Sequence, residues 1–163
     1  MSMSIHWSAF FYNLCVALNS LLLFFAIFAG ALELPVLLQV AGRAHPLVLH
    51  FPIVLAALCC FMEWAPTSRH KPELSSLRDG LMLSAAVSAC FAAILGLFLS
   101  REGGYDEKLL AWHQWSGVAL SLFLWGWYSF RNRIRNVNYA SWATSGAALV
   151  ILVLAGHQGA VLT

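Results

Sequence analysis

Histidines are the residues of this sequence whose chemistry most needs an explanation. His45 and His50 lie in the segment RAHPLVLHFP, residues 43–52, at the start of an apolar run that continues to Cys60. The proline directly after His45 suits the first turn of a helix, where its missing N–H costs nothing. Ionisable side chains inside a membrane-spanning segment are unfavourable unless they are paired, so they mark candidate functional sites. We therefore expect these imidazoles to bind haem or a metal ion.

The composition predicts an integral membrane protein. The 163 residues are 61% hydrophobic and 10% charged, whereas soluble proteins are about half apolar and about a quarter charged. A net charge of +2 with no basic patch gives no support for a nucleic-acid partner, so we expect none and expect the lipid bilayer to be the partner. The four cysteines form no C-x-x-C motif, so we expect them to be packing residues.

Five transmembrane helices are expected in one all-α domain that covers residues 1–163. Prolines and turn-forming residues separate the apolar runs, most clearly Pro35, Pro66 and the GGYD turn at residues 103–106. Small residues recur every four positions in the third helix, which makes a smooth stripe that another helix or a flat cofactor can approach closely. The stripe consists of Ser84, Ser88, Ala92 and Gly96. The expected helices cover approximately residues 8–30, 46–64, 77–99, 107–130 and 139–158.

The distribution of Lys and Arg predicts the orientation in the membrane, because cytoplasmic loops carry an excess of these residues. The loops after the second and fourth helices hold six of them, and the loops on the opposite side hold three. We expect the N-terminus in the cytoplasm and the C-terminus in the periplasm. The six are Arg69, Lys71, Arg78, Arg131, Arg133 and Arg135, and the three are Arg43, Arg101 and Lys108.

Alternating helix directions bring four histidines to the outer end of this predicted bundle. His45 and His50 begin the second helix, His113 begins the fourth, and His157 ends the fifth. We expect these four to form one layer near the periplasmic face. The remaining histidines are expected to be solvated at the inner end, namely His6 and His70.

A b-type haem needs two imidazoles from facing helices, apolar side chains around the macrocycle, and donors near the surface for its propionates. His50 and His113 are expected at similar depth on different helices. His45 and His157 are then available for a second haem or for a supporting role. The residues expected at the propionates are Arg43 and Arg101, and those expected to wall the ring are Phe51, Phe91, Trp112 and Trp115.

Two other uses of the histidines are open on the sequence alone. Three or four neutral imidazoles in one layer equally suit copper or zinc. Such a metal site would draw on His45, His50, His113 and His157. Alternatively, each imidazole caps a helix and hydrogen-bonds a backbone carbonyl without any ligand. Spacing alone does not choose among the pairings.

Three stretches of the sequence resemble a known family. They are LQVAGRAHPLVLHFP at residues 38–52, GGYD at 103–106 followed by His113 and Gly117, and GHQG at 156–159. Together they are similar to DUF2231, a family of predicted bacterial membrane proteins, over the second to fifth helices. The family pattern implies roles for His45, His50, His113 and His157. Members can be joined to planctomycete-type cytochrome c modules, which implies a redox setting. The sequence departs from the pattern at Ala160, where family members often have a second glycine.

The leading hypothesis is a cytochrome b-like electron-transfer subunit of the bacterial inner membrane. It would hold one or two b-type haems near the periplasmic face and exchange electrons with a cytochrome c, a quinol or a larger membrane redox complex. Electron transfer needs only close placement of cofactors, so we expect no catalytic residue, and we expect Glu33 and Glu63 to be interface residues. The alternatives are a cofactor-free accessory subunit of a respiratory or photosynthetic complex, and a copper- or zinc-binding membrane protein.

Overall fold

Helices form almost all of the computed structural model, which describes residues 2–65 and 72–162, and no strand occurs among these residues. The all-α prediction is therefore confirmed. His70, Arg69 and Lys71, which entered the predictions above, lie outside the described residues. The helices are α1 (Ser2–Ile27), the 3-10 helix η1 (Ala29–Ala31), α2 (Val36–Gly42), α3 (His45–Val48), α4 (His50–Trp64), α5 (Pro72–Leu99), the 3-10 helix η3 (Ser100–Glu102), α6 (Glu107–Arg135) and α7 (Asn138–Leu162).

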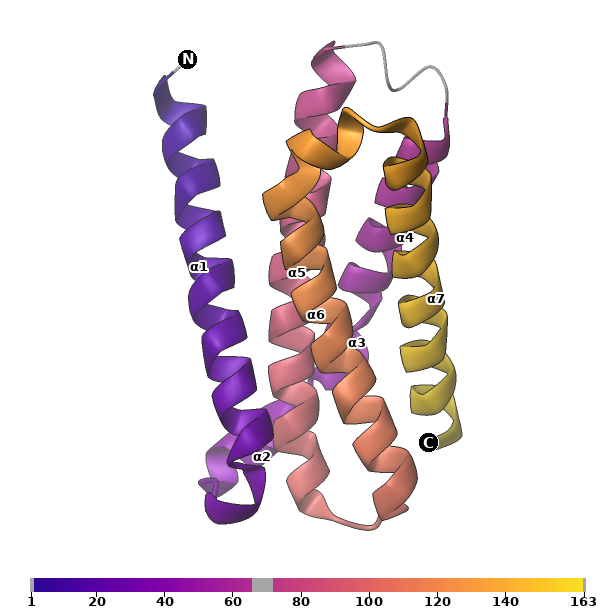
Figure 1. Cartoon of the computed structure of the whole chain (residues 1–163). Helices are drawn as coiled ribbons and strands as arrows, with labels where there is room; N and C mark the ends of the chain where they lie inside the picture. Colours follow the sequence, from indigo (N-terminus) through magenta and orange to yellow (C-terminus); the bar gives the residue numbers. More distant parts are fainter. Residues whose placement is uncertain (1, 66–71, 163) are drawn as a thin grey trace.

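Four of the long helices form a closed bundle, and the fifth lies against its outside. Helix α4 contacts α5 and α7, and α6 contacts the same two helices from the other side. Helix α1 packs along α5 and α6 at one edge of the molecule (Figure 1). The short helices α2 and α3 lead from α1 into α4 at the end of the bundle that holds the C-terminus (Figure 1).

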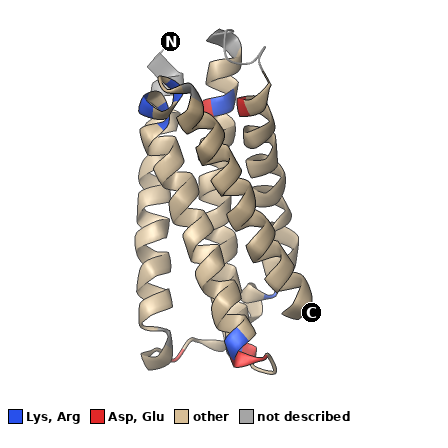
Figure 2. Ribbon diagram, turned by 45° about the vertical axis from the view of Figure 1, so that its right-hand side comes forward, with Lys and Arg blue, Asp and Glu red and all other residues tan. Residues whose placement is uncertain are grey.

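The chain is a multi-pass membrane protein. Four segments are long and apolar enough to cross a bilayer, namely His6–Ile27, Val36–Trp64, Leu74–Glu102 and Tyr139–Leu162. Helix α6 runs beside them in Figure 1, and its 29 residues exceed the length that a span requires. Charged residues lie at the two ends of the bundle and leave the middle of the helices free (Figure 2). This distribution is the one expected for helices embedded in lipid.

Ion pairs close the end of the bundle that holds the N-terminus. Glu63 on α4 and Arg78 on α5 are 1% and 3% exposed, and Arg78 Nε lies 3.3 Å from Glu63 Oε1. Arg131 Nε on α6 lies 2.9 Å from Asp79 Oδ2 on α5, and Arg135 pairs with both Asp79 and Glu63. The prediction that Glu63 is an interface residue is therefore wrong, because its side chain is buried and paired with arginines. These pairs also explain why α6 continues past residue 130 to Arg135.

A buried polar network holds α1 against the bundle. Ser121 on α6 donates to Asn19 Oδ1 on α1 at 3.0 Å, and its oxygen lies 2.8 Å from Cys90 Sγ on α5. Cys15 on α1 lies 3.9 Å from Cys90, measured between the sulfur atoms. Cys59 and Cys60 are buried as well, and all four cysteines are free thiols, in agreement with their predicted packing role.

Helix α2 packs so closely on the end of α5 that only glycine fits at the contact. A Cβ atom on Gly42 would lie 2.4 Å from the Leu99 backbone nitrogen. We expect Gly42→Ala to lower stability by about 1–3 kcal/mol, because the two backbones must move apart. Gly80→Ala is the matched control, since a Cβ there meets nothing within 4 Å. Thermal unfolding of the detergent-solubilised variants, followed by circular dichroism, should lower the midpoint for Gly42→Ala only.

Candidate functional site

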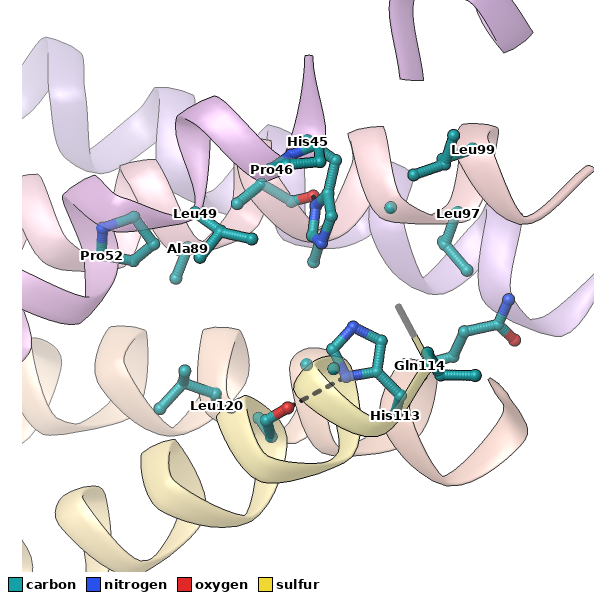
Figure 3. Close-up of a pocket in the computed structure, with 18 of the residues that line it drawn as sticks. His45, Pro46, Leu49, Pro52, Ala89, Leu97, Leu99, His113, Gln114 and Leu120 are labelled. Atoms are coloured by element: carbon teal, nitrogen blue, oxygen red, sulfur yellow. Dashed lines mark hydrogen bonds between the residues drawn. The ribbon is translucent and has the colours of Figure 1, made fainter. Parts of the chain in front are cut away.

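Two of the predicted histidines face each other inside the bundle. His45 begins α3, and His113 lies in the second turn of α6. Their ring centres are 6.2 Å apart, and the ring planes are nearly perpendicular, at 78°. Figure 3 shows the two rings pointing toward each other from opposite walls of a cavity. The structure therefore pairs His113 with His45 rather than with His50.

Each of these rings is held by a hydrogen bond to a backbone carbonyl of a neighbouring helix. His45 Nδ1 donates to the Ala92 carbonyl of α5 at 2.8 Å, and His113 Nδ1 donates to the Ala155 carbonyl of α7 at 3.0 Å. A carbonyl can only accept, so Nδ1 carries the hydrogen in both neutral rings. The lone pair is then on Nε2, which is the state that a metal-ligating histidine adopts when its other nitrogen is fixed in this way.

A glycine one helical turn beyond each carbonyl makes room for the ring. A Cβ atom on Gly96 would lie 3.1 Å from His45 Cε1, and one on Gly159 would lie 2.9 Å from His113 Cε1. The same arrangement, a carbonyl followed four residues later by glycine, thus occurs on α5 for His45 and on α7 for His113. Part of the small-residue stripe predicted on the third helix serves this purpose.

The facing rings border a cavity of about 410 Å³. Five helices, α3 to α7, contribute its lining, which is mostly aliphatic. Several lining positions hold small residues, so the helix surfaces there are smooth, as at Ala93 on α5, Gly117 on α6 and Gly156 on α7. Polar lining groups other than the histidines come from Ser100, Tyr105 and Gln114. The site is a largely apolar space with two facing histidine side chains on opposite walls.

The other predicted histidines are not part of this pair. His50 is exposed at the rim of the cavity, and its Nδ1 lies 3.4 Å from the carbonyl oxygen of Leu47, three residues earlier in the chain. His157 is exposed and does not line the cavity. His45 begins α3 and His50 begins α4, and although both line the cavity, it is the His45 ring that lies opposite His113. On α7, helix geometry turns His157 away from the face that carries Ala155 and Gly159.

The predicted arginines and aromatic residues also lie elsewhere. Arg43 is exposed and pairs with Glu102 at 2.8 Å, and Arg101 lines a smaller neighbouring cavity. The expected aromatic wall is wrong, because these side chains point outward from the bundle, where lipid surrounds them. They are Phe51, Phe91, Trp112 and Trp115, between 48% and 62% exposed.

The predicted layer of three or four imidazole ligands does not form. Across residues 2–65 and 72–162, no group of three or more His, Cys, Asp or Glu side chains comes together to hold a metal ion. The copper or zinc alternative therefore loses the multi-imidazole centre on which it was based. What the structure shows is one facing pair of histidine rings.

Comparison with known proteins places the chain in a family. The family model described as predicted membrane protein (DUF2231) matches residues 43–163. The chain belongs to the DUF2231 family. The DUF2231 match contains the four-helix bundle, both facing histidines and both glycines behind them, whereas α1 and α2 precede it. Searches of curated proteins and of solved structures give no match.

The sequence analysis identified both histidines but missed the carbonyl and the glycine that position each ring. The signal was present in the two spacings Ala92 to Gly96 and Ala155 to Gly159. Each places a backbone carbonyl and, one turn later, a residue without a Cβ atom on the same side of a helix. This signal was interpretable only once α3 and α6 were known to lie opposite these helices. The buried ion pairs of Glu63 were missed because a charge at the end of an apolar run is usually solvated.

Proposed function

We propose that this DUF2231 protein binds one b-type haem between His45 and His113 and serves as a cytochrome b-like electron-transfer subunit. The main support for this proposal is the distance between the centres of the two rings. Imidazole nitrogen binds a transition metal at about 2 Å, so two rings that share one ion have their centres about 6 Å apart. The observed separation of 6.2 Å agrees with that value.

The surroundings of the pair fit haem as well as its ligands do. A flat apolar macrocycle needs smooth walls, and the small residues of α5, α6 and α7 supply them. Ser100, Tyr105 and Gln114 offer hydrogen-bonding groups in the cavity lining for the propionates. Because one facing pair of histidines is present among the described residues, we propose one haem rather than two.

Ligation by two histidines favours electron transfer over catalysis. With His45 and His113 both holding the iron, a bound haem would have no open position for a substrate or for oxygen. When bound, haem supplies a reversible one-electron couple at the iron. The carbonyls of Ala92 and Ala155 accept the Nδ1 hydrogens of His45 and His113 and so strengthen the basicity of both rings, which would lower the reduction potential of a bound haem.

The site lies at the end of the bundle opposite the buried arginines. Following the excess of Lys and Arg at the N-terminal end, we place that end in the cytoplasm of a bacterial inner membrane and the haem near the periplasm. A cytochrome c or a larger membrane redox complex could then exchange electrons with it from outside. These partners are part of the proposal.

The absorption spectrum of the purified protein tests this function. Protein from cells with ample haem should show a Soret band, an α band on reduction, and a pyridine haemochrome of haem b at about one per chain. Metal analysis of the same sample should give iron in the same ratio. A haem-free protein that carries copper or zinc would contradict the proposal, and so would one that carries neither.

Adding one methyl group behind His113 should disturb the site without removing a ligand. In Gly159→Ala the new Cβ would lie 2.9 Å from His113 Cε1, so the ring must shift toward the cavity. We expect haem content to fall by about half or more, because ligand geometry must hold within about half an ångström. Gly126→Ala is the control, since a Cβ there meets nothing within 4 Å. Equal haem content in the two variants would show that Gly159 does not position His113.

A further inference from the structure

A second, smaller cavity lies directly beside the histidine cavity. Its volume is about 200 Å³. The two cavities share four lining residues, which are Leu97, Ser100, Leu110 and Gln114. A molecule in the smaller cavity would therefore be separated from the haem position by a single layer of side chains.

The N-terminal segment builds one wall of this smaller cavity. Phe25 comes from α1, and Leu32 and Leu34 come from the connection between η1 and α2. All three precede the family match at residues 43–163. The remaining wall comes from α5, η3 and α6 of the family bundle. The cavity thus exists because this chain places an additional segment against the DUF2231 bundle.

The lining combines aromatic rings with hydrogen-bond donors. Phe25 and Phe98 stand edge to face with ring centres 5.3 Å apart. Arg101 and Gln114 add a guanidinium and an amide, and within the described parts of the chain neither side chain hydrogen-bonds or pairs with another residue. Ser100 Oγ donates to Leu97 O at 2.8 Å, which leaves its oxygen able to accept.

We propose that this smaller cavity binds the headgroup of a membrane quinone. A quinone ring is flat and packs against aromatic side chains. Its carbonyl oxygens accept hydrogen bonds from a guanidinium or an amide, and the hydroxyls of the quinol donate to a serine oxygen or an amide oxygen. The cavity lies where the spans His6–Ile27 and Leu74–Glu102 end, so a lipid-borne headgroup reaches it from the bilayer.

The electron-transfer role of this cavity rests on the haem proposed above. Oxidation of one quinol to quinone releases two electrons and two protons. A haem held by His45 and His113 would accept these electrons one at a time, and a one-electron acceptor such as a cytochrome c would take up each of them. The two protons would be released to water at the end of the bundle that carries the exposed Glu102.

Binding of a short-chain benzoquinone to the detergent-purified protein tests the proposal by isothermal titration calorimetry. The unmodified protein should bind about one quinone per chain. Arg101→Gln should weaken binding about tenfold or more, as expected for the loss of a charged hydrogen bond. Leu34→Trp should abolish it by filling the cavity. Arg133→Gln, an exposed arginine at the other end of α6, is the matched control and should leave the affinity unchanged.

Haem content measured on the same samples separates this proposal from the previous one. His113→Ala should lose haem yet bind the quinone, because Arg101, Gln114 and the two phenylalanines remain. Absence of saturable quinone binding in a protein with a normal haem spectrum would overturn the quinone site alone. It would also be overturned if Arg101→Gln lowered haem content and left quinone affinity unchanged, since Arg101 would then hold a propionate.

Discussion

Replacing either His45 or His113 by alanine is expected to reduce haem content to less than about a tenth of that of the unmodified protein. Each substitution removes one of the two proposed axial ligands, and among the residues that line the cavity the one further imidazole is that of His50 at the rim. The remaining ring cannot hold the iron against loss to detergent. The ratio of Soret absorbance to protein absorbance in purified samples measures the effect.

The exposed histidines provide matched controls for this loss. His50→Ala and His157→Ala remove the same atoms from positions outside the facing pair, so we expect both to retain haem. Free imidazole added to His113→Ala should restore part of the Soret band by occupying the emptied space. Loss of haem in His50→Ala with retention in His45→Ala would reverse the assignment and return the pairing to the one expected from the sequence.

Glu63→Gln is expected to destabilise the bundle strongly without affecting the proposed haem site at the other end. The carboxylate is 1% exposed and accepts a hydrogen bond from Ser141 while it pairs with Arg78 and Arg135. Removing one partner of a buried ion pair leaves uncompensated charge in a medium of low dielectric constant, at a loss of about 3–5 kcal/mol. Thermal unfolding in detergent, followed by circular dichroism, should show a large decrease in the midpoint.

An exposed glutamate on the same bundle calibrates that result. Glu107 lies in the first turn of α6 at the opposite end, and Glu107→Gln should change stability by less than about 1 kcal/mol. Below its unfolding midpoint, Glu63→Gln should keep a normal haem spectrum. A midpoint equal to that of Glu107→Gln would mean that the ion pairs around Glu63 do not hold the four helices together.

The sequence was sufficient for the fold class because composition and proline placement act locally. Long apolar runs predict helices wherever they occur, and Pro35 separates α1 from α2 as expected. Helix ends were harder to predict. Helix α6 extends to Arg135 because Arg131 and Arg135 pair with residues of α4 and α5, and such contacts leave no mark in the sequence of α6 itself.

The candidate site was found in outline, and its pairing was not. Both His45 and His50 stand near a proline in an apolar run, so their chemistry looks alike in the sequence. What distinguishes them is that the His45 ring contacts the Ala92 carbonyl and the backbone at Gly96, on a helix that lies more than 40 residues away in the sequence. Aromatic residues were predicted to line the cavity because haem pockets contain them. In a membrane protein, however, large apolar side chains are as stable against lipid as in the protein core.

The electron paramagnetic resonance spectrum of the ferric protein tests ligation by His45 and His113 most directly. The two rings stand at 78° to each other. Nearly perpendicular imidazole planes leave the two iron orbitals that interact with them close in energy, which gives a low-spin signal dominated by one large g value. We predict this signal, and we predict its loss in His45→Ala and in His113→Ala. A high-spin signal from five-coordinate iron in the unmodified protein would show that the two histidines do not share one haem, and would contradict the proposed site.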